Sequence, residues 1–170
     1  MGGSGLDRRT FLSGRFAAAH PVPRPPWSRE AAIVSACSGC GACVEACPQS
    51  IIALDDRQKP FIDFKAGECT FCGSCADACP EPVFDRALAP FPHIAIIGQA
   101  CFAGRGIVCE SCGDACPEAA IRFQMTLGGP ALPSLAADRC TGCGACIAAC
   151  PADAIAASPL EAAGMEAGHA

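Results

Sequence analysis

The sequence predicts a small α+β protein built from two similar lobes. Three observations indicate this: a cysteine group that recurs four times in 170 residues, short apolar runs beside turns, and a shortage of large apolar side chains. Hydrophobic residues make up 51% of the chain, but 34 of them are alanine and 16 are cysteine. Because such a chain has little bulk for an ordinary core, we expect its cysteines to help hold the fold together.

Three of the cysteine groups share the spacing C-x2-C-x2-C-x3-C-P. They cover residues 37–48, 69–80 and 140–151, and a further group at 101–117 ends in the same way. In that group seven residues separate Cys101 from Cys109, where the other groups have two. A pattern copied along a chain indicates one supersecondary unit that is used several times.

Short apolar runs connect the groups in pairs. Residues 51–54 and 61–64 flank a polar turn, and residues 120–124 and 131–135 flank a Gly-Pro turn. Such runs predict strand, turn and strand. We therefore expect a lobe at 31–80, a proline-rich linker at 81–93 and a second lobe at 94–157. We expect tails with little structure of their own at residues 1–30 and 158–170.

The cysteine spacing indicates 4Fe-4S clusters. Three thiolates spaced by two residues can surround one face of a compact inorganic cube, while the fourth thiolate points away. The sequence thus predicts two tandem ferredoxin-like lobes of the bacterial two-cluster type, with a core dominated by clusters. A glycine follows one cysteine of each group, and we expect unusual φ values at these glycines; they are Gly41, Gly73, Gly113 and Gly144.

In two-cluster bacterial ferredoxins the fourth cysteine of each group binds the other cluster. If these lobes follow them, four clusters are held by four cysteine sets. The sets are Cys37, Cys40, Cys43 and Cys79; Cys69, Cys72, Cys75 and Cys47; Cys101, Cys109, Cys112 and Cys150; and Cys140, Cys143, Cys146 and Cys116. Local ligation by each fourth cysteine stays open. Cys101 is either a ligand carried back by a loop or a buried thiol, and in the second case three clusters are expected.

Zinc and disulfides fit the cysteine spacing less well than clusters do. Zinc sites use paired C-x2-C halves separated by a loop, and disulfides require an oxidising compartment. The three histidines, His20, His93 and His169, lie outside the cysteine groups, and we expect them on the surface or in loops. No G-x-G-x-x-G follows a predicted strand, and no nucleophile–base pair is found. We expect no catalytic residues and no enzyme.

Charge and hydropathy exclude further classes. The net charge is −5, so no basic patch indicates nucleic acid, and no run of about 18 apolar residues predicts a membrane span. Each oxidised cluster with four thiolates adds roughly −2, so four of them give about −13. We therefore expect partners with a basic surface. The oligomeric state is not indicated.

Other sequence features accompany the cysteines: "RRTFLSGR" at residues 8–15, "RPPWS" at 24–28, and the long gap after Cys101. With these features the chain resembles the NapF family, the ferredoxin-type proteins of the periplasmic nitrate reductase system, over residues 7–157. The resemblance implies an accessory protein. It would contact the molybdenum- and iron–sulfur-containing catalytic subunit before export and assist maturation of that subunit's cluster. The alternatives are a soluble electron-transfer polyferredoxin and a binding chaperone with structural clusters.

The N-terminal residues bear on location. Arg8-Arg9 resembles a twin-arginine export signal, which needs about 7–15 apolar residues after the arginines. Residues 16–19 are instead followed at once by the proline-rich stretch 20–26, so we expect a cytoplasmic protein, as in the family. Two interpretations of Trp27 stay open. It either anchors a polyproline segment to a partner or packs on the first lobe.

Overall fold

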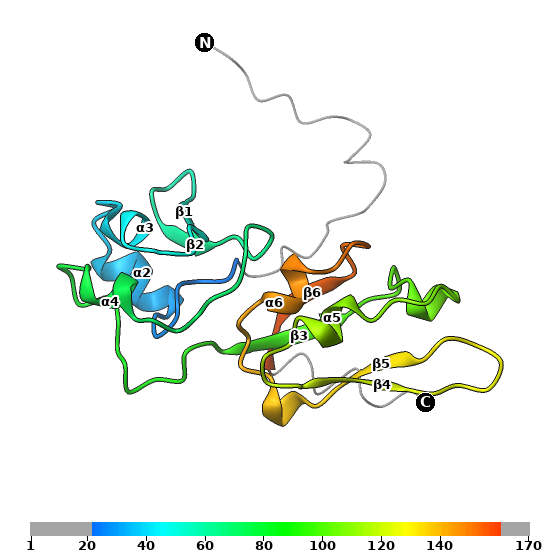
Figure 1. The fold of residues 1–170 in the computed structure, drawn as a ribbon. Coiled ribbons are helices and arrows are strands. Elements are labelled where there is room, and N and C mark those ends of the chain that lie inside the picture. The colour runs from blue at the N-terminus through cyan, green and yellow to red at the C-terminus, as the bar shows by residue number, and fades with distance from the viewer. Residues whose placement is uncertain (1–21, 161–170) are drawn as a thin grey trace, which may run out of the picture.

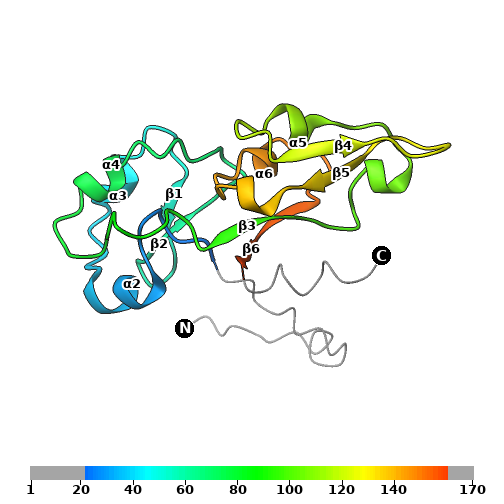
Figure 2. The ribbon, with the colours of Figure 1, turned by 90° about the horizontal axis from the view of Figure 1, so that it is seen from below.

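The computed structural model describes residues 22–160, which form two lobes side by side (Figures 1 and 2). The first lobe contains α2 (Glu30–Ala36), α3 (Ala42–Glu45), β1 (Ile52–Leu54), β2 (Pro60–Ile62) and α4 (Ser74–Asp77). The second contains β3 (His93–Ile97), η1 (Ala103–Arg105), α5 (Ser111–Asp114), β4 (Ile121–Gln124), β5 (Leu132–Leu135), η2 (Ala137–Arg139), α6 (Ala145–Ala148) and β6 (Ile155–Pro159). Both lobes are thus built from short helices and short strands.

Each lobe contains the hairpin that its apolar runs predict. β1 pairs antiparallel with β2, with Ile52 opposite Ile62, and β4 pairs antiparallel with β5. Ile52 and Ile62 are buried and pack against Cys43 and Cys75 in one apolar cluster. The hairpin therefore supplies apolar side chains that pack against the cysteine loops, in place of a larger core.

A third strand pair closes the second lobe. β3 pairs antiparallel with β6, with Ile97 opposite Ile155 and His93 opposite Pro159. The lobe therefore begins at His93, which we had expected in the linker, and its last strand extends past residue 157. The expected tail is wrong for Ser158 and Pro159, because both pair with β3 and Ser158 is buried.

The residues before α2 are also built into the fold. The N–H of Trp27 donates to the carbonyl of Pro90 over 2.9 Å, and the N–H of Asp85 donates to the carbonyl of Trp27 over 2.8 Å. The N–H of Ile62 donates to the carbonyl of Pro23 over 2.8 Å. Prolines have no N–H to leave unpaired, but their carbonyls accept hydrogen bonds from neighbouring segments. The expected tail is therefore wrong for residues 22–30.

Residues 1–21 and 161–170 lie outside the described residues, and so do Arg8-Arg9, His20 and His169. Among residues 22–160, no helix is both long enough and apolar enough to cross a membrane.

The cysteine repeat is visible in the backbone. Gly41, Gly73 and Gly144 precede α3, α4 and α6 and have φ values of 81°, 82° and 85°. These glycines take the left-handed conformation that side chains disfavour.

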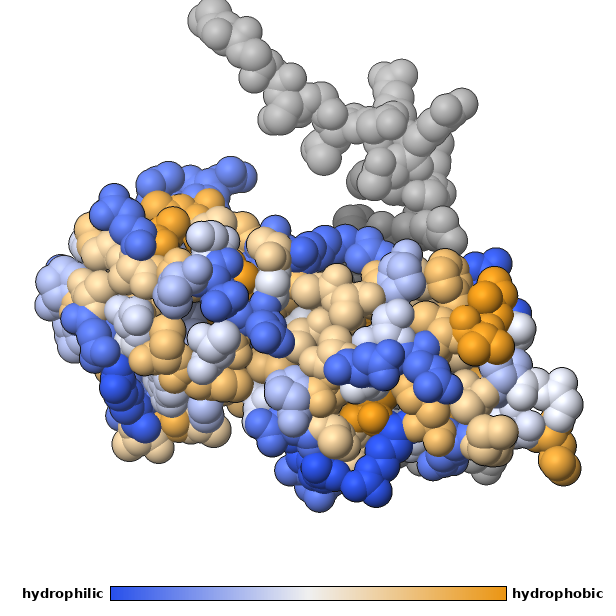
Figure 3. Space-filling model, in the orientation of Figure 1, coloured by the Kyte–Doolittle hydropathy of each residue, from blue (hydrophilic) through white to orange (hydrophobic). Residues whose placement is uncertain are grey.

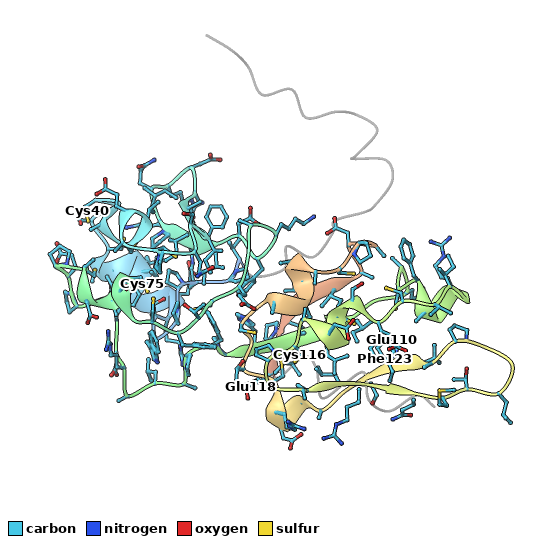
Figure 4. All side chains as sticks on the ribbon, in the orientation of Figure 1. Cys40, Cys75, Glu110, Cys116, Glu118 and Phe123 are labelled. Carbon is cyan, nitrogen blue, oxygen red and sulfur yellow. The ribbon has the colours of Figure 1, made fainter. Side chains whose placement is uncertain are left out.

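The expectation for Gly113 is wrong, because Gly113 follows the third cysteine of its group and lies within α5, whereas the other three glycines follow the second cysteine. Glu110 takes the equivalent position and has a φ of −128°. Gly113 is needed for space instead, since a Cβ there would lie 2.8 Å from the ring of Phe123. Figure 4 labels Glu110 and Phe123 in the second lobe.

Candidate metal centres

The first lobe contains a cavity surrounded by four cysteines. It measures about 340 Å³ with its space open to solvent, and Ile51 and Ile52 form part of its apolar wall. The four thiols are those of Cys47, Cys69, Cys72 and Cys75. Three of them belong to the second cysteine group and one to the first. The structure thus brings together the set that crossed ligation requires.

The second lobe contains a similar cavity of about 330 Å³. Its cysteines are Cys101, Cys109, Cys112 and Cys150, so the fourth cysteine again comes from the other group. Cys101 reaches the cavity in spite of the long gap that follows it.

The insert after Cys101 folds into a tight turn of its own. The N–H of Arg105 donates to the carbonyl of Cys101 over 3.1 Å, and the N–H of Ile107 donates to the carbonyl of Phe102 over 2.9 Å. Gly106 between them has a φ of 85°. This turn carries the chain outward and back, so that Cys101 lies beside Cys109 at the cavity. The placement agrees with the loop interpretation of Cys101.

The electrostatic neighbours of Cys43 and Cys146 agree with the remaining two proposed sets. Burial raises the pKa of Cys43, and the negative charges of Cys37, Cys79 and Cys40 raise it further. The neighbours of Cys43 are thus the other members of the first set.

The fourth set shows the same pattern. Burial raises the pKa of Cys146 to about 12, and the charges of Cys140, Cys143 and Cys116 contribute in the same direction. Figure 4 shows Cys40 and Cys75 in the first lobe and Cys116 in the second.

The thiol environments fit a buried metal centre. The third cysteine of each group is 6–9% exposed and is held by the short helix that follows the loop; these are Cys43, Cys75, Cys112 and Cys146. Burial raises the pKa of Cys75 to about 12 and that of Cys112 to about 11. A buried thiolate is unfavourable unless a cation compensates it. Iron would supply that charge and displace the protons.

Hydrogen bonds reach several of the sulfur atoms. The N–H of Ala120 donates to Sγ of Cys116, and the N–H of Ala154 donates to Sγ of Cys150, both over 3.3 Å. The pKa of Cys72 is lowered, chiefly by a hydrogen bond with the side chain of Ser74. Donors of this kind stabilise negative charge on sulfur and are among the groups that set cluster potentials.

The spacing of the cysteines differs from that of a site for one ion. Among residues 22–160, no three His, Cys, Asp or Glu side chains are grouped to hold a single metal ion. Cysteines instead line two pockets in sets of four, one set in each lobe.

His93 is not a surface residue, contrary to our expectation. It is 8% exposed, and its Nε2–H donates to the carbonyl of Gly142 over 3.1 Å. Its ring lies 4.7 Å from that of Phe91 and 5.6 Å from that of Phe64. Burial lowers the pKa of His93, which favours the neutral ring. Phe91 is near His93 in sequence, but Phe64 and Gly142, which complete its surroundings, lie in other segments.

Arg86 is a further residue that the sequence did not single out. Its Nη2 donates to the carbonyl of Gly73 over 3.0 Å and to Asp77 over 2.6 Å. Gly73 directly follows Cys72, so a positive charge lies beside the second cysteine set.

Comparison with known proteins agrees with this geometry. The 4Fe-4S dicluster domain family matches residues 36–83 and 106–157. The chain is 40% identical over 168 residues to ferredoxin-type protein NapF of Haemophilus influenzae. It is 41% identical over 158 residues to ferredoxin-type protein NapF of Escherichia coli K12. Both alignments cover 92% of this chain and 96% of the relative.

The chain belongs to the NapF family of ferredoxin-type proteins. Membership confirms the resemblance found in the sequence, and the dicluster match supports 4Fe-4S clusters as its cofactors. The second matched segment begins at residue 106, so Cys101 lies outside it. The number of clusters and the ligand sets therefore stay predictions.

Proposed function

We propose that this protein is a cytoplasmic polyferredoxin accessory protein. It holds four 4Fe-4S clusters and assists iron–sulfur maturation of the catalytic subunit of the periplasmic nitrate reductase before that subunit is exported. The observation that supports the cofactor assignment is a pair of pockets, one in each lobe, each lined by four cysteines drawn from both groups of that lobe. The partner and its maturation are supported by the family resemblance.

Each cluster is held by one set: Cys37, Cys40, Cys43 and Cys79; Cys47, Cys69, Cys72 and Cys75; Cys101, Cys109, Cys112 and Cys150; and Cys116, Cys140, Cys143 and Cys146. A 4Fe-4S cluster supplies one-electron redox chemistry when bound. The chain fixes the thiols on short loops and helices, covers the third thiol of each group from water, and donates N–H groups to Cys116 and Cys150.

Surface chemistry supports binding to another protein. Four large apolar side chains are exposed in the second lobe, two just after η1 and two in the β4–β5 turn. Figure 3 shows separate hydrophobic spots at this end of the molecule. These residues, which we call the outer apolar patch, are Ile107, Val108, Met125 and Leu127, with exposed fractions of 54%, 79%, 87% and 107%. Apolar side chains exposed together on a soluble domain are typical of a contact site. We assign this patch to the contact with the catalytic subunit.

A second candidate function is soluble electron transfer to another redox protein. Cys40 and Cys72 are exposed, each in a different cysteine set. Clusters held there would lie near the surface, where an electron donor or acceptor could approach them. This candidate needs the same clusters but a different partner.

Capture from cytoplasmic extract tests the maturation role. The tagged, full-length protein should retain the catalytic subunit while the signal peptide is present and retain less of it once the signal peptide is removed. Met125→Ser with Leu127→Ser should weaken capture several-fold. Val34→Ser is the matched control, since Val34 is 63% exposed on the first lobe. Cells carrying Cys69→Ala with Cys72→Ala should lose reductase activity although quinol oxidation upstream is intact.

The opposite pattern would favour the electron carrier. In that case the reductase from the variant cells is fully metallated and active, and the purified protein is rapidly oxidised by another soluble redox enzyme. Full reductase maturation by a protein whose clusters cannot be reduced would instead indicate a binding chaperone with structural clusters.

A further inference from the structure

One backbone hydrogen bond joins the two lobes at their cysteines. The N–H of Cys69, in the second group, donates to the carbonyl of Cys143, in the fourth group, over 2.8 Å. Within residues 22–160, it is the one backbone hydrogen bond between proposed ligands in different lobes. The path from the sulfur of Cys69 to that of Cys143 therefore runs through covalent bonds and a single hydrogen bond.

The close approach depends on glycines beside Cys143. A Cβ on Gly144 would overlap the ring of Phe64, which comes from the first lobe. A Cβ on Gly142 would lie 2.7 Å from the carbonyl oxygen of His93. A larger residue at position 144 would therefore press on the first lobe, whereas one at position 142 would press on the start of β3 in its own lobe. Gly142 and Gly144 thus leave room that the neighbouring groups occupy.

The surrounding interface is apolar and closely packed. Phe64 is 4% exposed, and its ring lies 5.9 Å from that of Phe91 in an edge-to-face arrangement. Ile147 and Ala157 of the second lobe pack against the apolar cluster of the first lobe. Lys65 and Asp153 form an ion pair at the exposed rim. A shared core of this kind fixes the lobes relative to each other, unlike two domains on a flexible linker.

Each lobe also brings its own two cysteine sets together. The short helices α3 and α4 contact each other in the first lobe, and α5 and α6 do so in the second (Figure 1). Cys43 lies in α3 and Cys75 in α4, and in the second lobe Cys112 lies in α5 and Cys146 in α6. The four sets therefore follow one another through the molecule, with those of Cys69 and Cys143 in the middle.

We propose that the contact between Cys69 and Cys143 makes the two lobes a single electron-transfer unit. An electron moves between the cluster of the Cys69 set and that of the Cys143 set through this hydrogen bond. One cluster is oxidised by one electron and the other is reduced by one electron, so no proton moves and no covalent bond changes. The outer sets, those of Cys37 and Cys101, are the two ends where external one-electron donors and acceptors exchange electrons.

This inference rests on the proposed cluster ligation and is independent of the partner. Iron and sulfide content therefore has to be measured in every sample. A sample without clusters contradicts the proposed ligation, whereas a fully loaded sample without coupling between lobes contradicts this inference alone.

Electron paramagnetic resonance of the reduced, full-length protein tests the contact. Cys40→Ala with Cys109→Ala removes the two outer clusters and leaves the inner ones. After reduction with dithionite, the inner clusters should show a spectrum split by mutual spin interaction. Two independent spectra from a sample with about eight iron atoms would overturn the proposal.

The steric design provides a second test in the otherwise unchanged protein. Gly144→Ala should separate the lobes, weaken the interaction between them and slow redistribution of electrons after partial reduction. Gly41→Ala is the matched control, because Gly41 has the same place in its group and a φ of 81° but no atom within 4 Å of its added Cβ. If Gly144→Ala keeps its iron and has the wild-type spectrum, the proposal is wrong. If Gly144→Ala loses iron, the proposal is decided by the variant that combines Cys40→Ala with Cys109→Ala.

Discussion

The guanidinium of Arg86 lies over the indole ring of Trp27, with its central carbon 5.7 Å from the ring centroid. The ring of Trp27 also meets that of Phe71 edge to face, with 6.5 Å between centroids. Trp27 therefore packs on the first lobe. This is one of the two interpretations of Trp27 that the sequence left open. Arg86 in turn donates to the carbonyl of Gly73, so the contact extends to the second cysteine set.

Arg86→Gln should lower the reduction potential of the cluster held by the Cys69 set. Reduction adds negative charge, which the guanidinium beside Cys72 stabilises. Arg86 is about half exposed and paired with Asp77, so we expect a change on the order of 10–40 mV. Potentiometric titration followed by electron paramagnetic resonance measures it. Arg86→Lys keeps the charge and should stay near wild type, and an equal drop in both variants would contradict an electrostatic origin of the change.

The iron content should be about 16 atoms per chain, four for each cluster, in anaerobically purified protein. Cys101→Ala should reduce this content to about 12 or leave a three-iron cluster. Ser111→Ala, which changes a neighbour of Cys109 without removing a thiol, is the control. A wild-type value already near 12, unchanged by Cys101→Ala, would show that the third group is incomplete. Stoichiometric zinc without sulfide would contradict the cluster assignment.

Paired substitutions distinguish crossed from local ligation. Cys47 lines the same cavity as Cys72, so Cys47→Ala with Cys72→Ala should damage one cluster. Cys47→Ala with Cys40→Ala should damage two. Iron and sulfide analysis separates these outcomes, because effects at one site do not add whereas those at independent sites do. The reverse pattern would indicate local ligation.

The folded state should depend on the clusters. Metal-binding free energy becomes folding free energy in small domains with few large apolar residues. Removal of iron by a chelator under oxidising conditions should therefore abolish cooperative unfolding and resistance to protease. A thermal scan and a proteolysis time course measure both, with untreated anaerobic protein as the control. An apo-protein that keeps a sharp transition would contradict this expectation.

Features that depend on local spacing could be predicted from the sequence. The cysteine spacing and the apolar runs predicted both hairpins, because each hairpin is formed by two strands that follow one another along the chain. The repeat also identified the sixteen candidate ligands. Their assignment to crossed sets came from the likeness to two-cluster ferredoxins and stays a prediction. The expectation for Gly113 fails because Glu110, not a glycine, follows the second cysteine of the third group, and Gly113 comes one cysteine later.

Features that depend on distant segments could not be predicted. His93 is buried because Phe64 and Gly142, far away in sequence, lie against it. β3 pairs with β6, and no pattern in either strand specifies the other. The proline-rich segment was expected to be a tail on composition alone, whereas its carbonyls accept hydrogen bonds from β2 and other segments.

The cavity lined by Cys47 and Cys69 has a consequence for synthesis on the ribosome. Cys47 emerges early, but the other three thiols around its cavity emerge only with the second group. On the proposed ligation, the Cys47 set is complete only when Cys75 has left the exit tunnel, and the Cys37 set only when Cys79 has followed. In the second lobe the last thiols of the two sets are Cys146 and Cys150. A nascent chain therefore carries several unliganded thiols at once, and then becomes ready for two clusters almost together. The cell's cluster-delivery machinery has to supply iron and sulfide to each lobe in pairs of clusters.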